Sequence, residues 1–268
     1  MDWILQKKYL LLFLLILIIA SFLRLYNITE TPPGFYADEA MYANNGLYAW
    51  EHNDFRVFYS ENFGREGLWS NIIGFFILLW GNEPWVSRSI AAVFGILTVL
   101  GTYFLARELF ISLRNTKLYK NTNIQTPELI ALFSSFFIAT NVWHILFSRI
   151  GFRAIMAPLF LVWAMYFLLK SFHAVQESNE SDEEFKNQNL KFKIIPILSR
   201  ILDKVGTIKN SKSFIFAILW GIAFGLGFHT YIAFRVMPLL IALMFGFYWF
   251  STHDWGVRKK LFIATLLF

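Results

Sequence analysis

Residues 9–25 read YLLLFLLILIIASFLRL, an apolar run with a single charge, Arg24, near its end. A run of this length approaches the roughly 20 residues that an α-helix needs to cross a bilayer. Lys7 and Lys8 precede it, and no small-residue cleavage site follows, because the chain continues as Arg24-Leu25-Tyr26-Asn27. The stretch therefore predicts an uncleaved first membrane span, not a signal peptide.

Apolar runs of this kind recur along the chain. Hydrophobic residues make up 57% of the sequence and aromatic residues 19%, more than one soluble domain needs. We expect an all-α polytopic membrane protein with about seven transmembrane helices, the last one truncated, so that a C-terminal remainder is absent. After the first span, the others are expected at 85–106, 128–148, 152–170, 213–231, 236–250 and from 261 onward. The sequence contains no Cys, which excludes disulfides and thiolate metal sites.

Leu68–Trp80, LWSNIIGFFILLW, decides the topology. Its 13 residues are too few to cross a bilayer and favour an interfacial or re-entrant helix. If it does not cross, all 13 Lys and four Arg lie on one side, and seven Arg lie on the other. The positive-inside rule makes the lysine-rich side cytoplasmic. Residues 26–84 are then an outer loop that carries juxtamembrane helices, and residues 171–212 are a cytoplasmic connector.

The outer loop holds candidate acid–base groups. Asp38 and Glu39 follow a turn-forming stretch, Thr31–Gly34, close to the end of the first span. An acidic pair at a helix start often only complements the helix dipole. Here, however, further ionisable residues share the loop, among them Glu61, Arg65 and Glu66. We therefore predict that the loop contacts a substrate.

Four arginines lie at outer helix ends, where positive charge is normally depleted: Arg88, Arg149, Arg153 and Arg235. Each one alone is explained by snorkelling to the interface. A shared anion, such as a phosphate or pyrophosphate at the membrane surface, would explain all of them together. His144 and His229 lie near the same ends without metal-motif spacing, and we interpret both as packed interior histidines.

The order of these features resembles the C-type membrane glycosyltransferases, with a first span, an outer Asp-Glu pair and a half-buried apolar helix. Within that class the chain is similar to the protein O-mannosyltransferase and aminoarabinose transferase group. The similarity lies in Glu83–Ala92 and Tyr103–Arg107, where Arg88 matches the arginine that begins the second span in that group. Ser148–Arg153 and Thr230–Arg235 also resemble bacterial members.

The resemblance implies transfer of a sugar from a polyprenyl-phosphate donor to a protein, lipid or glycan acceptor. The reaction would take place at the outer face of a bacterial plasma membrane. Asp38 would be the general base and Glu39 would orient the acceptor or the sugar hydroxyls. The four arginines would hold the donor phosphate, and Glu61, Arg65 and Glu66 would belong to the substrate loop. No cofactor and no metal site are predicted, although some relatives place a divalent cation in this loop and a metal-dependent variant stays open. No nucleic-acid partner is expected.

Two other classes compete with this interpretation. A polytopic transporter would show inverted repeats and polar residues at mid-membrane, and the predicted spans show neither. A non-catalytic membrane scaffold would make Asp38 dispensable.

Overall fold

The computed structural model describes residues 2–61, 64–114, 127–189 and 211–243, and it is almost entirely helical. Its elements are, in chain order, α1 Asp2–Leu25, α2 Ala37–His52, β1 Phe58–Tyr59, β2 Arg65–Glu66, α3 Leu68–Trp80, α4 Pro84–Arg114, α5 Pro127–Thr140, α6 Val142–Arg149, η1 Arg153–Ile155, α7 Met156–Asn189, α9 Ser211–Gly227 and η2 Ile232–Val236.

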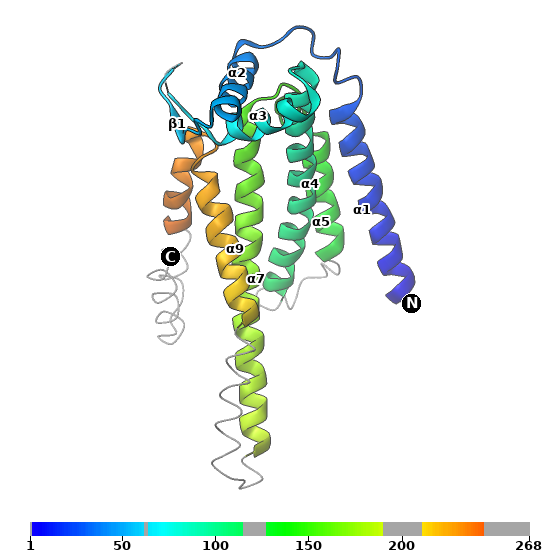
Figure 1. Cartoon of the computed structure of the whole chain (residues 1–268). Coiled ribbons are helices and arrows are strands. Elements are labelled where there is room, and N and C mark those ends of the chain that lie inside the picture. Colours follow the sequence, from blue (N-terminus) through cyan, green and yellow to red (C-terminus); the bar gives the residue numbers. More distant parts are fainter. Residues whose placement is uncertain (1, 62–63, 115–126, 190–210, 244–268) are drawn as a thin grey trace.

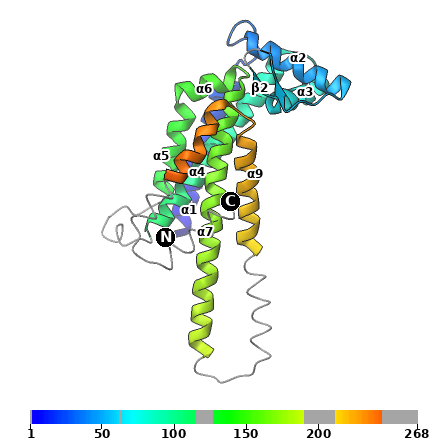
Figure 2. The same cartoon turned by 90° about the vertical axis from the view of Figure 1, so that its left-hand side faces the viewer.

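The long helices run side by side as a bundle, and the short elements gather at one end of it (Figure 1). α7 packs on α9 and α4, and α4 packs on α5. Strands β1 and β2 form a two-residue antiparallel hairpin with Tyr59 opposite Arg65. α2 and α3 project sideways from the end of the bundle (Figure 2). By the predicted topology this is the outer end.

Three helices are long and apolar enough to cross a membrane: Lys7–Leu25, Pro84–Ile111 and Arg153–Ala174. Residues 127–149 make a fourth if the bent pair α5–α6 is one span. The described part of the chain therefore does not reach the seven spans expected. The span expected at 213–231 is shorter, because α9 ends at Gly227. The next is described only as an apolar helix over Ile232–Leu243, and the run from 261 lies outside the described residues.

The expected continuous span 128–148 is broken by a 55° bend at Asn141. Arg24, on α1, donates to the carbonyls of Ile138 (3.1 Å) and Ala139 (2.9 Å), which lie at the end of α5. The side chain of Asn141 then accepts a hydrogen bond from the backbone N–H of His144 and starts α6. Both new helix ends thus have partners for their unpaired backbone groups, which stabilises the break.

An arginine of α6 in turn holds the C-terminal end of α1. Arg149, the last residue of α6, donates to the carbonyls of Leu23 and Arg24, and its other Nη donates to Tyr26 and Thr31, each at 2.8 Å. A cation at a helix C-terminus also complements the helix dipole. α1 and the α5–α6 pair therefore each supply the arginine that completes a helix end of the other.

α3 is present with the predicted bounds and lies against α2. Gly46 and Gly74 allow the two backbones to touch, because a Cβ on Gly46 would lie 2.1 Å from the Ser70 carbonyl oxygen. Trp69, in the first turn of α3, is fully buried and donates to the Gly151 carbonyl at 2.9 Å. The α2–α3 pair is thereby attached to the turn that precedes α7.

Candidate functional site

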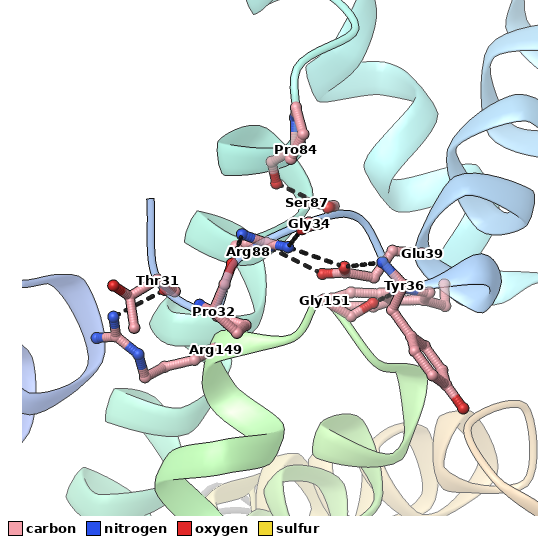
Figure 3. Close-up of polar contacts among 11 residues, drawn as sticks. Thr31, Pro32, Gly34, Tyr36, Glu39, Pro84, Ser87, Arg88, Arg149 and Gly151 are labelled. Carbon is pink, nitrogen blue, oxygen red and sulfur yellow. Dashed lines mark hydrogen bonds and ion pairs between the residues drawn. The ribbon is translucent and has the colours of Figure 1, made fainter. Parts of the chain in front are cut away.

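Two separate polar groups lie at this end of the bundle, and the first surrounds Glu39. The Glu39 carboxylate is fully buried, and its Oε2 accepts a hydrogen bond from the Tyr36 backbone N–H at 3.0 Å, which caps the start of α2. Arg88 of α4 forms a two-point ion pair with it, Nε to Oε1 at 3.1 Å and Nη2 to Oε2 at 3.2 Å (Figure 3). The pair holds the first turn of α2 against the first turns of α4.

The remaining donors of Arg88 also contact the protein. Nη1 donates to the Pro32 carbonyl at 2.9 Å, and Nη2 donates to the Gly34 carbonyl at 2.5 Å. A small pocket of about 280 Å³ lies beside this guanidinium, lined by Pro32, Pro33, Gly34, Phe35, Tyr36, Glu39, Arg88 and Ile150. The observed role of Arg88 is thus to hold the turn that precedes Asp38.

Gly151 makes the buried pair possible. Its φ is +56°, a conformation that other residues rarely adopt, and a Cβ there would lie 2.8 Å from Oε1 of Glu39. The turn between α6 and η1 therefore passes directly over the carboxylate. This turn sends Arg149 to one side, toward α1, and Arg153 to the other.

The second group contains Asp38. Asp38 is half-buried on the first turn of α2, and Tyr42 follows it by four residues, which places both on one face of the helix. Burial raises the pKa of Tyr42 to about 12, and Asp38 acts in the same direction, while Arg153 and Arg65 oppose it. Tyr42 therefore stays neutral at physiological pH. Asp38, Arg65 and Arg153 thus all act on the pKa of the Tyr42 hydroxyl.

Two arginines from distant parts of the chain, Arg153 and Arg235, share the carboxylate of Glu66, and Arg65 precedes Glu66 in β2. We call Arg65, Arg153, Arg235 and Glu66 the arginine cluster. Nη1 of Arg153 donates to Oε2 of Glu66 at 2.5 Å, and Nη2 of Arg235 donates to Oε1 at 2.6 Å. Arg153 also lies over the ring of Tyr231, 5.5 Å from its centroid. β2, η1 and η2 each contribute to the cluster, so it forms only in the folded bundle.

Arg65 is the most enclosed cation of the cluster, with a side chain that is 1% exposed. Its guanidinium lies between the rings of Tyr42 and Tyr59, at 5.4 and 5.9 Å, and Nη1 contacts the sulfur of Met41. Its Nη2 is 3.5 Å from the exposed carboxylate of Glu61. Within the described residues, Nε of Arg65 and Nε of Arg153 have no hydrogen-bond partner. The cluster thus holds buried cationic donors that the protein does not use.

The structure therefore divides the predicted site residues. It brings Arg65, Glu66, Arg153 and Arg235 together, with Glu61 at the edge of this set. Asp38 lies on the same face of α2 as Tyr42, whose ring Arg65 contacts. Arg88 instead forms an ion pair with Glu39, and Arg149 donates hydrogen bonds to carbonyls at the end of α1. Tyr42 and Tyr231 contact the cluster and were not predicted, although the spacing of four residues between Asp38 and Tyr42 on a helix was a usable signal.

The two histidines differ from the prediction in part. His144 is half-buried and its Nδ1 lies 2.8 Å from Nη2 of Arg24, in keeping with a packed residue. His229 is exposed, so its interpretation as an interior histidine is wrong. In the described part of the chain, no three His, Asp or Glu residues are placed to hold a metal ion.

Comparison of the chain with protein-family models, with curated proteins and with solved structures gives no match. The resemblance to the C-type glycosyltransferases thus stays a prediction from the residues quoted above, and any functional assignment depends on the geometry at the end of the bundle that carries α2 and α3.

Proposed function

We propose that this protein is a membrane glycosyltransferase that moves a sugar from a polyprenyl-phosphate donor to an acceptor at the outer face. One observation carries the proposal: the half-buried Asp38 lies one turn before Tyr42 on α2, and the Tyr42 ring is 5.4 Å from the guanidinium of Arg65, which belongs to an arginine cluster with unused donors. An acid–base group next to a phosphate-binding group is what such a transfer requires.

Asp38 is the general base in this proposal. Its carboxylate takes the proton from an acceptor hydroxyl, the acceptor oxygen forms a bond to C1 of the sugar, and the bond from C1 to the phosphate oxygen breaks. The electron pair stays with the phosphate, so the carrier leaves as a polyprenyl monoester with one more negative charge. Guanidinium groups stabilise that charge through bidentate hydrogen bonds.

The arginines that fit the phosphate-binding role best are a revised set. Arg153 and Arg235 remain from the original four, and Arg65 joins them because it is buried with unused donors. Arg88 and Arg149 each make four hydrogen bonds to backbone carbonyls or a buried carboxylate of the protein itself (Figure 3). In the proposal they position the site and do not touch the phosphate.

The test separates chemistry from binding. Asp38→Asn should lower the rate of transfer by about 10²–10⁴-fold, the usual contribution of a positioned base. Binding of a polyprenyl phosphate should be unchanged in this variant, because the arginine cluster is intact. Arg153→Lys keeps the charge but loses the planar fork, so it should weaken binding. Transfer is measured with membranes that supply donor and acceptor, and binding is measured on the purified protein.

Asp54→Asn is the matched control for Asp38. Asp54 is an exposed carboxylate just beyond the other end of α2, paired with Arg56 at 2.6 Å, and its loss should change neither readout. Near-normal transfer by Asp38→Asn would reject the proposal and leave the scaffold interpretation in its place.

A further inference from the structure

The carboxylate of Glu66 occupies an unusual position within the arginine cluster. Each of its two oxygens accepts a short hydrogen bond from a different arginine, Arg153 at 2.5 Å and Arg235 at 2.6 Å. Its side chain is only 7% exposed. A buried anion held between two guanidinium groups is the arrangement in which such groups also hold a phosphate. Glu66 therefore uses the same donors that the proposed substrate needs.

The two arginines that bind Glu66 differ in exposure and in their other contacts. The side chain of Arg153 is 12% exposed and is also held over Tyr231, whereas that of Arg235 is 52% exposed. A phosphate group arriving from the membrane surface can reach Arg235 first. Once it binds there, it stands next to the negative charge of Glu66 in a partly desolvated place, where like charges repel strongly.

We propose that Glu66 is an internal counter-anion, which holds the Arg153–Arg235 pair in the unliganded protein and is displaced, first from Arg235, when a phosphate group binds. This inference rests on the proposed function for its ligand, and it adds a competitor that is part of the chain. The shared chemistry is that of a phosphate group, whether free or on a lipid. The half-exposed position of Arg235, at a turn beside the end of the bundle, favours the lipid.

A pair of isosteric variants tests the competition. Glu66→Gln keeps the shape but removes the charge, and it should bind a polyprenyl phosphate roughly tenfold or more tightly than the wild type, the scale of one charge-assisted hydrogen bond. Glu61→Gln removes the same charge from the same hairpin, where the carboxylate is exposed and 3.5 Å from Arg65. It should change the affinity much less. Inorganic phosphate, tested in parallel, should bind more weakly than the lipid to every form.

A measurement on the wild-type protein does not depend on whether Glu66→Gln folds. Carbodiimide coupling of an amine to carboxylates, read by mass spectrometry, should modify Glu66 slowly in the unliganded protein. Saturation with polyprenyl phosphate should increase modification of Glu66 several-fold, while neutral polyprenol should not. Modification of the exposed Glu61 serves as the internal reference.

The outcomes distinguish this inference from the proposed function. If wild type and Glu66→Gln bind polyprenyl phosphate equally and ligand leaves the modification of Glu66 unchanged, the counter-anion is rejected and the proposed function stands. If no form binds the lipid phosphate, both are rejected. Tighter binding by Glu66→Gln, or ligand-dependent modification of Glu66, supports the displacement.

Discussion

Asp38 and Glu39 are neighbours in sequence, and the fold gives them opposite environments. Glu39 points into the protein, where both of its oxygens contact Arg88 and one also accepts from the Tyr36 backbone N–H. Asp38 is half-buried on the face that includes Tyr42. The pair thus separates into a residue that holds the loop and a residue that can meet a substrate. Their functions should be separable by experiment.

Removal of one partner from the Glu39–Arg88 pair should destabilise the fold. Glu39→Gln and Arg88→Gln should each lower the free energy of unfolding by about 3–5 kcal/mol, the cost of leaving a buried charge without its partner. The double variant should be less destabilised than the sum of the two, because the lone charge is gone. Thermal unfolding of the purified protein in detergent measures all three.

The exposed pair Asp54–Arg56 is the control for that cycle. Both side chains are well exposed, so solvent screens their attraction and the same substitutions should leave the unfolding temperature unchanged. Additive effects of Glu39→Gln and Arg88→Gln would contradict a direct buried interaction.

At the scale of elements, the contact between α2 and α3 depends on two glycines. Gly46 faces Gly74 across the interface. A Cβ on Gly46 would overlap backbone atoms of Ser70 and Gly74, and a Cβ on Gly74 would overlap backbone atoms of Gly46. Backbone atoms cannot move aside as a flexible side chain can. The close approach fixes α3 beneath α2 and, through Trp69, against the turn at Gly151.

Gly46→Ala should therefore separate α2 from α3 and lower both stability and transfer activity. We expect a loss of about 1–3 kcal/mol, typical of an overpacked interface. Gly221→Ala is the matched control, since Gly221 lies within α9 with nothing within 4 Å of its Cβ position. Alanine there should be neutral or stabilising, because glycine inside a helix is less favourable than alanine by up to about 1 kcal/mol. Equal unfolding temperatures for the two variants would show that the α2–α3 contact is not tight.

α3 and the break between α5 and α6 show what the sequence can predict about elements. The bounds of α3 were predicted because Leu68–Trp80 is a distinct apolar run of 13 residues, and in the structure Gly67 and Gly81 cap its two ends. The break was missed because residues 128–148 contain neither Pro nor Gly and remain apolar across Asn141. Its cause is Arg24, which lies more than a hundred residues earlier. The Arg24 guanidinium donates hydrogen bonds to the two carbonyls at the end of α5 that a straight helix would have paired internally. Local patterns carry no trace of such a partner.

At the scale of the molecule, the charge pattern predicted that Asp38 would meet arginines at one end of a bundle. It did not predict how Arg88, Arg149, Arg153 and Arg235 would divide between ion pair, helix cap and cluster. In the sequence, all four are simply arginines at helix ends. Only the packing of α1, α4 and η1 assigns each guanidinium to its partner, and those contacts join residues that are far apart in the chain.

The predicted topology places residues 26–84 outside as one loop, with α3 lying along the surface. Single cysteines at Glu61 and Asn82, both exposed and on either side of α3, should both react with a membrane-impermeant maleimide added to intact cells. The chain has no native Cys, so each label reports one position. A cysteine at Lys212 should react only after the cells are permeabilised. Labelling of just one of the two outer positions would mean that α3 crosses the membrane.

The exchange of arginines between α1 and the α5–α6 pair also bears on how the protein is made. α1 precedes α5 and α6 in the chain, so Arg24 is synthesised before residues 138 and 139. Until α5 arrives, that guanidinium has only its own helix and the lipid headgroups to contact; until α6 arrives, the last carbonyls of α1 lack Arg149. Each segment thus lacks a partner for one of its helix ends until the other segment is present. We therefore expect the contacts between α1 and the α5–α6 pair to form only after α6 has been synthesised, and α1 to stay close to the later helices until then.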